Sequence, residues 1–574
     1  MDVAISLQKK NLTSLREKAW ARWAALGLLA FAMFCSYVFM DILSPIKDLL
    51  QSQRGWDSLA FGTMQGSETF LNVFIFFLIF AGIILDKLGV RFTALLSGAV
   101  MVVGALINWY ALTPYFLESS LRVWFDTHLN HIPVFDWLGV SPFYESMPAS
   151  AKLSAVGFMI FGCGVEMAGI TVSRGIVKWF KGKEMALAMG SEMALARLGV
   201  ATCMIFSPVL ANTAEGINVA RPVAFGVLLL IIALIMFIVY FFMDRKLDSQ
   251  TNEAEDKDEP FKISDLGKIL SSSGFWLVAL LCVLYYSAIF PFQKYAPNML
   301  QCNLTLNEPS PGTFWGEGGD SSWIQYVVML FTAAFAFASN FSKKKINSII
   351  MAGLAVACLA TYCWMGYMRQ SAGAIFAVFP LLAVGITPIL GKYVDYKGKA
   401  ASMLLIGSAL LIMCHLTFAF ILPEMKDSPI GGVIVAYVTI LVLGASFSLV
   451  PASLWPSVPK LVDSKIIGSA YAIIFWIQNI GLWLLPLLIG KVLDNTNADI
   501  AQALENNTMT EEVAAVSYNY TWPLVMLAGL GVAAFFISIL LKRIDKKKNL
   551  GLELPNIEEP LEEQLAPQVA DAEM

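Results

Sequence analysis

Long apolar runs separated by short polar loops make up most of the chain. Crossing the hydrocarbon core of a bilayer takes about 20 residues of helix, and each run is close to or above that length. Charged residues fall mainly between the runs. The pattern predicts fourteen membrane-spanning helices, at residues 22–42, 58–85, 91–112, 153–176, 184–211, 222–243, 275–298, 322–340, 347–368, 372–391, 401–422, 430–453, 466–490 and 521–541.

The composition agrees with a membrane protein. Of the 574 residues, 57% are hydrophobic and 14% are charged, whereas an ordinary soluble domain has about 25% charged residues. The mean hydropathy is +0.67. A net charge of −4, with scattered basic residues, gives no indication of nucleic-acid binding. The sequence therefore predicts an all-α polytopic protein in a lipid bilayer.

Lysine and arginine concentrate in alternate loops, including the SKKK loop at 342–345 and the segment 542–548. The intervening loops, such as 307–320, are acidic or neutral. Loops rich in lysine and arginine stay on the cytoplasmic side of a membrane. With an even number of spans, both termini are expected to be cytoplasmic.

A charged linker at 244–274 separates a six-span half at 1–243 from a longer half at 275–545, and an acidic tail predicted to be disordered follows at 546–574. Two loops, GIILDKLGVR at 82–91 and GKYVDYKGKA at 391–400, share the spacing of a Gly, an Asp and a second Gly. Such duplication is typical of transporters built from repeats around a central site. Aligning the repeats leaves 322–368 as an inserted helical hairpin.

Two charged residues lie deep inside neighbouring apolar runs. Glu166 precedes Lys178, at the cytoplasmic end of the fourth span, by 12 residues, and Arg197 follows Glu184, at the start of the fifth, by 13. At 1.5 Å per residue, both are roughly 18–20 Å from the cytoplasmic end, near the midplane. A charge at this depth needs a partner. Either the two form a structural ion pair, or a zwitterionic solute bridges them.

The sequence shows no catalytic or metal-binding motif. Its three histidines are scattered, and seven of its eight cysteines lie inside apolar runs. A nucleophile, a base and an orienting group are not found together. We therefore expect neither an enzyme nor a site for a cofactor or metal.

The loop at 82–91 resembles the signature between the second and third helices of the major facilitator superfamily. The resemblance implies a fold of two six-helix halves, here with the extra hairpin. It also implies that the residues of this loop and of its second copy control the conformational change. The residues concerned are Gly82, Asp86, Lys87, Gly89 and Arg91 in the first copy, and Gly391 and Asp395 in the second.

Longer blocks, including FGCGVEMAG, WFKGKEMALAMGSEMALARLG and GASFSLVPASLWPSVPKLV, resemble the branch of this superfamily that contains the lysosomal dipeptide transporter. The resemblance implies that Glu166 binds the substrate amine and Arg197 its carboxylate. Arginine suits that role because its planar fork binds a carboxylate through two hydrogen bonds. Further candidates to line the substrate site are Tyr285, Tyr286, Trp455, Gln478 and Asn479.

Three acidic residues are candidates for proton coupling: Glu192, Glu68 and Asp41. The first two stand where the resembled branch has uncharged residues. A carboxylate inside a membrane protein can exchange a proton in each transport cycle. Alternatively, Glu192 only offsets Arg174 or Lys181, and Asp41 is a solvated helix end or part of a gate. Uniport and proton symport therefore both stay open.

We thus expect a transporter of dipeptides that works by alternating access as a monomer. A carrier of organic anions or other small metabolites is the alternative within transport. A solute sensor that does not transport is the alternative of another class. The two added spans, and tails without a lysosomal sorting signal, favour the cytoplasmic membrane of a bacterium.

Overall fold

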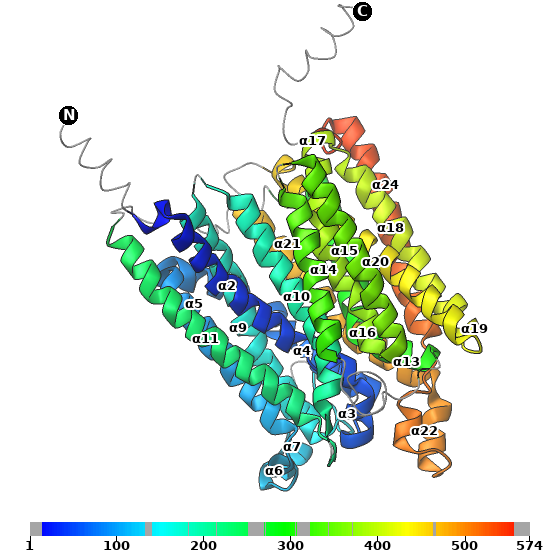
Figure 1. Ribbon diagram of the computed structural model, residues 1–574. Helices are drawn as coiled ribbons and strands as arrows, with labels where there is room; N and C mark the ends of the chain where they lie inside the picture. The colour runs from blue at the N-terminus through cyan, green and yellow to red at the C-terminus, as the bar shows by residue number, and fades with distance from the viewer. Residues whose placement is uncertain are drawn as a thin grey trace, which may run out of the picture.

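A computed structural model of the protein describes residues 14–132, 141–181, 183–213, 215–250, 269, 271–304, 306, 322–342, 344–369, 371–462 and 467–555. These residues form an elongated bundle of helices (Figure 1). A short antiparallel pair, β1 (Asn212–Thr213) and β2 (Gly216–Ile217), follows one helix. Among the described residues, 13 helices are long and apolar enough to span a bilayer, which confirms the predicted all-α membrane fold.

The described residues of the N-terminal half form six long helices. They are α2 (Ala19–Met40), α4 (Ser58–Phe74), α5 (Phe77–Ala111), α9 (Ala149–Phe180), α10 (Met185–Ala211) and α11 (Ala220–Asp248). Shorter elements connect them: η1 (Leu15–Glu17), η2 (Ser44–Ile46), α3 (Lys47–Arg54), α6 (Pro114–Leu117) and α7 (Ser120–His128).

The structure divides the second and third spans at residues other than those that the sequence predicts. The second span breaks at Phe76, whose φ of 54° is left-handed, so that α4 ends early and α5 begins at Phe77. Within α5, Gly89 has a φ of 76° and a ψ of 168°, which are not helical values. Glycine adopts a positive φ without a steric penalty. Therefore α5 holds the end of the second span and the whole of the third, on either side of Gly89.

The C-terminal half has six further core spans and the hairpin. Its elements are α13 (Ser273–Asn303), α14 (Ser322–Phe341), α15 (Lys345–Arg369), α16 (Ala372–Phe376), α17 (Val378–Lys397), α18 (Ala400–Leu416), the π-helix η4 (Thr417–Ile421), α19 (Leu422–Glu424), α20 (Pro429–Ser457), η5 (Val458–Lys460), α21 (Ile467–Thr496), α22 (Ala498–Glu505), α23 (Glu511–Ala514) and α24 (Thr521–Lys548).

Helices α14 and α15 occupy the residues of the predicted hairpin and pack against each other. Helix α14 also touches both halves. Its Tyr326 packs against Phe206 of α10, with ring centroids 4.9 Å apart. Its Asn340 donates a hydrogen bond of 3.1 Å to the carbonyl of Gly385 in α17. The hairpin therefore covers the place where α10 and α17 meet.

The start of α2 and the end of α24 lie at the same end of the bundle, which we call the termini end; α3 and α22 mark the far end (Figure 1). Glycines show where the two halves touch. A Cβ atom on Gly62 or Gly490 would lie 2.1 Å from a backbone oxygen of the other half. Gly169, Gly190 and Gly391 have no such atom within 4 Å. The halves are therefore in close contact towards the far end, whereas the three glycines towards the termini end have open space beside them.

The segment predicted as a disordered tail begins with ordered structure. Helix α24 continues to Lys548, and residues 549–555 lie against the loop between α17 and α18. The side chain of Glu553 accepts hydrogen bonds from the backbone and the hydroxyl of Ser402, at 2.7 and 2.8 Å. Lys460 donates to the carbonyls of Gly551 and Leu554. Residues 556–574 of the predicted tail lie outside the described residues.

Candidate functional site

Four charged side chains meet around Tyr37 of α2. Glu68 comes from α4, Glu166 from α9, and Glu192 and Arg197 from α10, and all four interact electrostatically with the Tyr37 phenol. Each of the four is only partly buried. We call these four residues the charged cluster. Tyr37 itself had no charge or motif that would mark it as a candidate in the sequence.

Arg197 is held by aromatic rings. Its guanidinium carbon lies 4.9 Å from the ring centre of Phe447, 5.1 Å from that of Phe290 and 5.8 Å from that of Tyr37. A cation is attracted to the negative face of an aromatic ring at such distances. Within the described ranges, Arg197 makes no ion pair. The rings therefore fix the guanidinium while its hydrogen-bond donors stay available to a ligand.

Glu166 has a different partner from the one that a structural ion pair would require. The side-chain amide of Asn479, in α21 of the other half, donates a hydrogen bond of 3.4 Å to a Glu166 carboxylate oxygen. Glu166 and Arg197 are not bonded to each other in the described part of the chain. The structure thus brings Asn479 next to Glu166 and leaves the acid and the base apart.

The C-terminal half contributes an aromatic wall. The indole of Trp455 donates a hydrogen bond of 3.1 Å to the hydroxyl of Tyr286. The Tyr286 ring in turn lies 5.3 Å from Phe290, one of the rings around Arg197. Two predicted site residues, Tyr286 and Trp455, are therefore connected to the charged cluster through Phe290.

Tyr285 and Gln478 have hydrogen-bond partners within their own half. Tyr285 is fully buried, and its hydroxyl bonds to the carbonyl of Leu404 and to Ser408, both in α18. Because successive residues of a helix point in different directions, Tyr285 faces the interior of its own half while Tyr286 faces the cluster. The contact of Tyr285 with substrate stays a prediction. The Cys282 thiol donates a hydrogen bond of 3.4 Å to the side-chain oxygen of Gln478.

Asp41 forms a buried ion pair with Lys294, in α13 of the other half. The Lys294 ammonium lies 2.8 Å from one Asp41 oxygen, and Gln293 donates to the other oxygen at 2.8 Å. Lys294 also donates to the carbonyl of Met40 at 2.8 Å. Asp41 is therefore neither a solvated helix end nor alone. Lys294 was not among the predicted site residues, although a lysine inside an apolar span is costly and marks a functional position.

At the far end, Asp494 of α21 holds the start of α4. Its two carboxylate oxygens accept hydrogen bonds from the backbone of Ser58 at 3.2 Å and of Leu59 at 2.7 Å. The first backbone N–H groups of a helix have no acceptor within the helix, so a carboxylate that accepts from them is stabilising. The Ser58 carbonyl accepts from Tyr295 of α13 at 2.9 Å. Asp57 caps the same turn, and burial raises the pKa of its carboxyl. These bonds join the two halves.

At the termini end, the signature loop forms ion pairs within its own half. Asp86 pairs with Arg174 of α9. Arg91 lies 3.2 Å from Asp248 and 3.8 Å from Asp244, both in α11. Asp86 and Arg91, two of the predicted gating residues, thereby connect the loop to the neighbouring helices α9 and α11.

The other predicted gating residues lie as follows. Lys87 is exposed, Gly82 and Gly391 have open space around them, Gly89 forms the break in α5, and Asp395 interacts electrostatically with Lys460.

Asp244 is the best-connected acid of this region, and its loss is expected to destabilise the protein. Its buried carboxylate accepts from Lys178 at 2.7 Å, from the Trp179 indole at 2.9 Å and from Tyr240 at 3.2 Å. Removing one partner of a buried ion pair costs about 3–5 kcal/mol. We expect Asp244→Asn to lower the melting temperature of the purified protein strongly.

Asp248→Asn is the matched control for this prediction. Asp248 binds the same lysine, at 2.6 Å, but its side chain is 33% accessible to solvent. Pairs that reach solvent contribute about 0–1 kcal/mol. Equal losses of melting temperature in the two variants would contradict the role given to Asp244.

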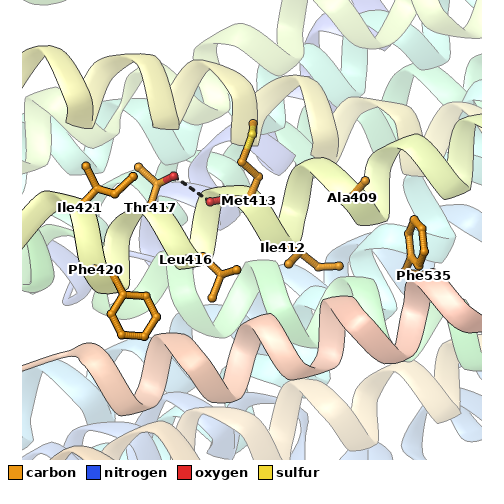
Figure 2. Close-up of a pocket in the computed structure, with 8 residues that line it drawn as sticks. All are labelled: Ala409, Ile412, Met413, Leu416, Thr417, Phe420, Ile421 and Phe535. Carbon is orange, nitrogen blue, oxygen red and sulfur yellow. Dashed lines mark hydrogen bonds between the residues drawn. The ribbon is translucent and has the colours of Figure 1, made fainter.

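A separate apolar groove lies outside the charged cluster. It has a volume of about 640 Å³ and lies between α18 and α24. Figure 2 shows the side chains that line it, and all but Thr417 are apolar. The Thr417 hydroxyl donates to the carbonyl of Met413 at 2.8 Å and is thereby satisfied. A groove of this kind suits lipid chains and cannot orient a zwitterion.

Two helical halves that meet at one end, with a charged cluster between them near the middle of α9 and α10, define a membrane transporter. The sequence model of the Major Facilitator Superfamily matches residues 29–373. This match covers more than half of the chain, and the chain belongs to this superfamily.

Known proteins of similar sequence and structure agree with this family. The lysosomal dipeptide transporter MFSD1 of Danio rerio is 23% identical over 82% of this chain and 81% of its own length. The protein of the same name from Homo sapiens is 24% identical over 60% of each chain.

Among solved structures, a mutant of the nucleoside transporter NupG superimposes with a TM-score of 0.56 at 12% identity, covering 90% of this chain and 98% of that one. A bacterial homologue of the human lysosomal transporter Spinster, in an inward-facing and unoccupied conformation, gives a TM-score of 0.53 at 12% identity. It covers 92% of this chain and 98% of that one. These two likenesses concern the fold alone.

Proposed function

We propose that this protein transports dipeptides, with Glu166 binding the amine of the substrate and Arg197 its carboxylate. The observation that carries the proposal is that the acid and the base are fixed separately. Rings hold the guanidinium of Arg197, and Asn479 holds the carboxylate of Glu166. A zwitterion of suitable length satisfies both charges at once. The relatives named as dipeptide transporters support the same substrate class.

Alternating access follows from the contacts between the halves. Close contacts at the far end and open space around glycines at the termini end correspond to a state that opens towards the termini end. We propose that this end faces the cytoplasm, because its loops are rich in lysine and arginine. A bacterial cytoplasmic membrane stays a prediction, since the relatives above are named as lysosomal.

The experiment is a ligand screen by thermal stability. A solute at about 100 times its dissociation constant stabilises a protein by roughly 2.7 kcal/mol. We expect dipeptides to raise the melting temperature of the purified protein, and single amino acids, tripeptides and dicarboxylates to leave it unchanged. Glu166→Gln removes the negative charge and is expected to abolish the response to dipeptides. Glu118→Gln, at an exposed position remote from the cluster, is the matched control.

A carrier of organic anions is the second candidate, because Arg197 offers a cation without an ionic partner among the described residues. The three carboxylates of the charged cluster oppose it, since like charges repel an anionic solute. Stabilisation by dicarboxylates but not by dipeptides would favour this candidate and reject the first.

A further inference from the structure

The chain after α24 folds back onto its own half at the termini end. Residues 550–555, which we call the C-terminal strap, lie against the second signature loop, 391–400. The backbone amide of Ala400 donates a hydrogen bond of 3.2 Å to the carbonyl of Leu552. The amide of Lys399 donates one of 3.1 Å to the next carbonyl of the strap. Because Leu552 is also fully buried, the strap is a folded part of the C-terminal half.

The strap fixes both the turn of this loop and the start of α18. Gly398 has a φ of 72°, and a Cβ atom there would lie 2.4 Å from the carbonyl oxygen of Glu553. Lys399 precedes the first residue of α18, but its side chain does not cap that helix. The Glu553 carboxylate takes this role, because it accepts from the backbone and the hydroxyl of Ser402. A carboxylate that accepts from the free N–H groups of a helix start is stabilising.

The first signature loop is held by a charged side chain in the corresponding place. Its last residue, Arg91, pairs with Asp244, which lies 24 residues after the first residue of α11. The last residue of the second copy is Ala400, which carries no charge, although Asp545 also lies 24 residues after the start of its helix, α24. The Asp545 carboxylate accepts a hydrogen bond of 2.9 Å from the backbone of Leu552. A strap amide therefore binds the acid of α24, as an arginine binds the acid of α11.

Lys460, which follows α20, adds a second helix end to these contacts. Its ammonium donates to the strap carbonyls of Gly551 and Leu554, at 3.0 and 2.8 Å. It also interacts electrostatically with Asp545 and with Asp395 of the loop. The strap thus joins the loop, the start of α18 and the ends of α20 and α24.

We propose that the C-terminal strap positions the second signature loop during transport, in place of the arginine that the first loop has. The inference rests on the proposed alternating access and adds a positioning element to it. In alternating access, the two halves move largely as rigid bodies about a central site. Every partner of the strap named above belongs to the C-terminal half, so these contacts stay intact when the halves move. The loop and the helix ends therefore keep their places within that half.

Two shortened chains test the position of the loop. The chain 1–555 keeps the strap, whereas the chain 1–549 lacks it. Hydrogen exchange measured by mass spectrometry follows the amides of Lys399 and Ala400, which donate to strap carbonyls. We expect these amides to exchange at least about tenfold faster in the chain 1–549 than in the chain 1–555. Peptides around Gly89, in the loop of the other half, should exchange equally in both chains and are the internal control.

Glu553→Gln makes the same test in the chain of full length. The variant removes the charge at the start of α18 and keeps the shape of the side chain. We expect the Ser402 amide to exchange faster by about 2- to 30-fold, since a helix cap contributes about 0.5–2 kcal/mol. Glu118→Gln, at its exposed position towards the far end, should exchange like the wild type.

Uptake of alanylalanine into proteoliposomes tests the role of the strap in transport. We expect the maximal rate per folded protein to be about 2- to 30-fold lower for the chain 1–549 than for the chain 1–555. The dissociation constant from thermal titration should be the same for both, because the strap lies at the termini end and not at the charged cluster.

Equal exchange of the loop amides in the two chains would overturn the inference. So would equal maximal rates, because the strap would then only stabilise the fold, which a lower melting temperature alone would report. Should the chain 1–549 fail to fold, Glu553→Gln with wild-type exchange and wild-type uptake would overturn the inference in the same way. Absence of uptake by the wild type would reject the proposed function, and the exchange comparison would then decide about the strap by itself.

Discussion

Replacing Arg197 by lysine is expected to weaken dipeptide binding by about 10- to 100-fold. Hydrogen bonds to a charged group contribute about 1.5–3 kcal/mol, and each 1.4 kcal/mol is a factor of ten in affinity. Lysine keeps the positive charge but lacks the planar fork that meets a carboxylate with two hydrogen bonds. The rings of Phe290 and Phe447 are placed for a flat guanidinium, at 5.1 and 4.9 Å. Dissociation constants from thermal titration with alanylalanine measure the effect.

The control for this variant is Arg221→Lys. Arg221 is exposed near the start of α11 and remote from the charged cluster. We expect the control to bind dipeptides like the wild type. If Arg197→Lys also bound dipeptides with an affinity within about twofold of the wild type, only the charge of Arg197 would matter. The substrate carboxylate would then not form a bidentate hydrogen bond with the guanidinium.

The depth of Glu166 and Arg197 could be predicted from the sequence because helices advance by a constant rise per residue. The groups that hold these two side chains in place could not be predicted from the sequence. The partner of Glu166 is Asn479 of the other half, and the rings around Arg197 come from α2, α13 and α20. Such contacts depend on how the two halves approach each other, which apolar periodicity does not specify.

The same limit applies to the fold. Long apolar runs predicted the number of spans, and Gly89 lies in the loop that was expected between the second and third spans. The break at Phe76 was not predicted, because the sequence around it is apolar and contains neither glycine nor proline. Asp41 and Lys294 form their pair across the halves, so the sequence showed two isolated charges instead of one ion pair.

Adding a single methyl group at Gly62 or Gly490 is expected to stop transport while leaving dipeptide binding in place. The Cβ atom of Gly62→Ala would lie 2.1 Å from the Pro486 carbonyl oxygen, and that of Gly490→Ala the same distance from the Ser58 carbonyl oxygen. These are backbone atoms of the opposite half, so they cannot move away by a change of side-chain rotamer. Overpacking costs about 1–3 kcal/mol, which lowers the population of the state closed at the far end by about 5- to 150-fold.

Uptake of alanylalanine into proteoliposomes measures the effect on transport, and thermal titration measures binding separately. Gly27→Ala and Gly169→Ala are the matched controls, because these helical glycines have no atom within 4 Å of the new methyl group. Alanine also has the higher helix propensity, so the controls should be at least as stable as the wild type. Full transport by Gly62→Ala would show that α4 and α21 need not come this close during the cycle. Equal loss in all four variants would point to damage to the helices and not to a blocked gate.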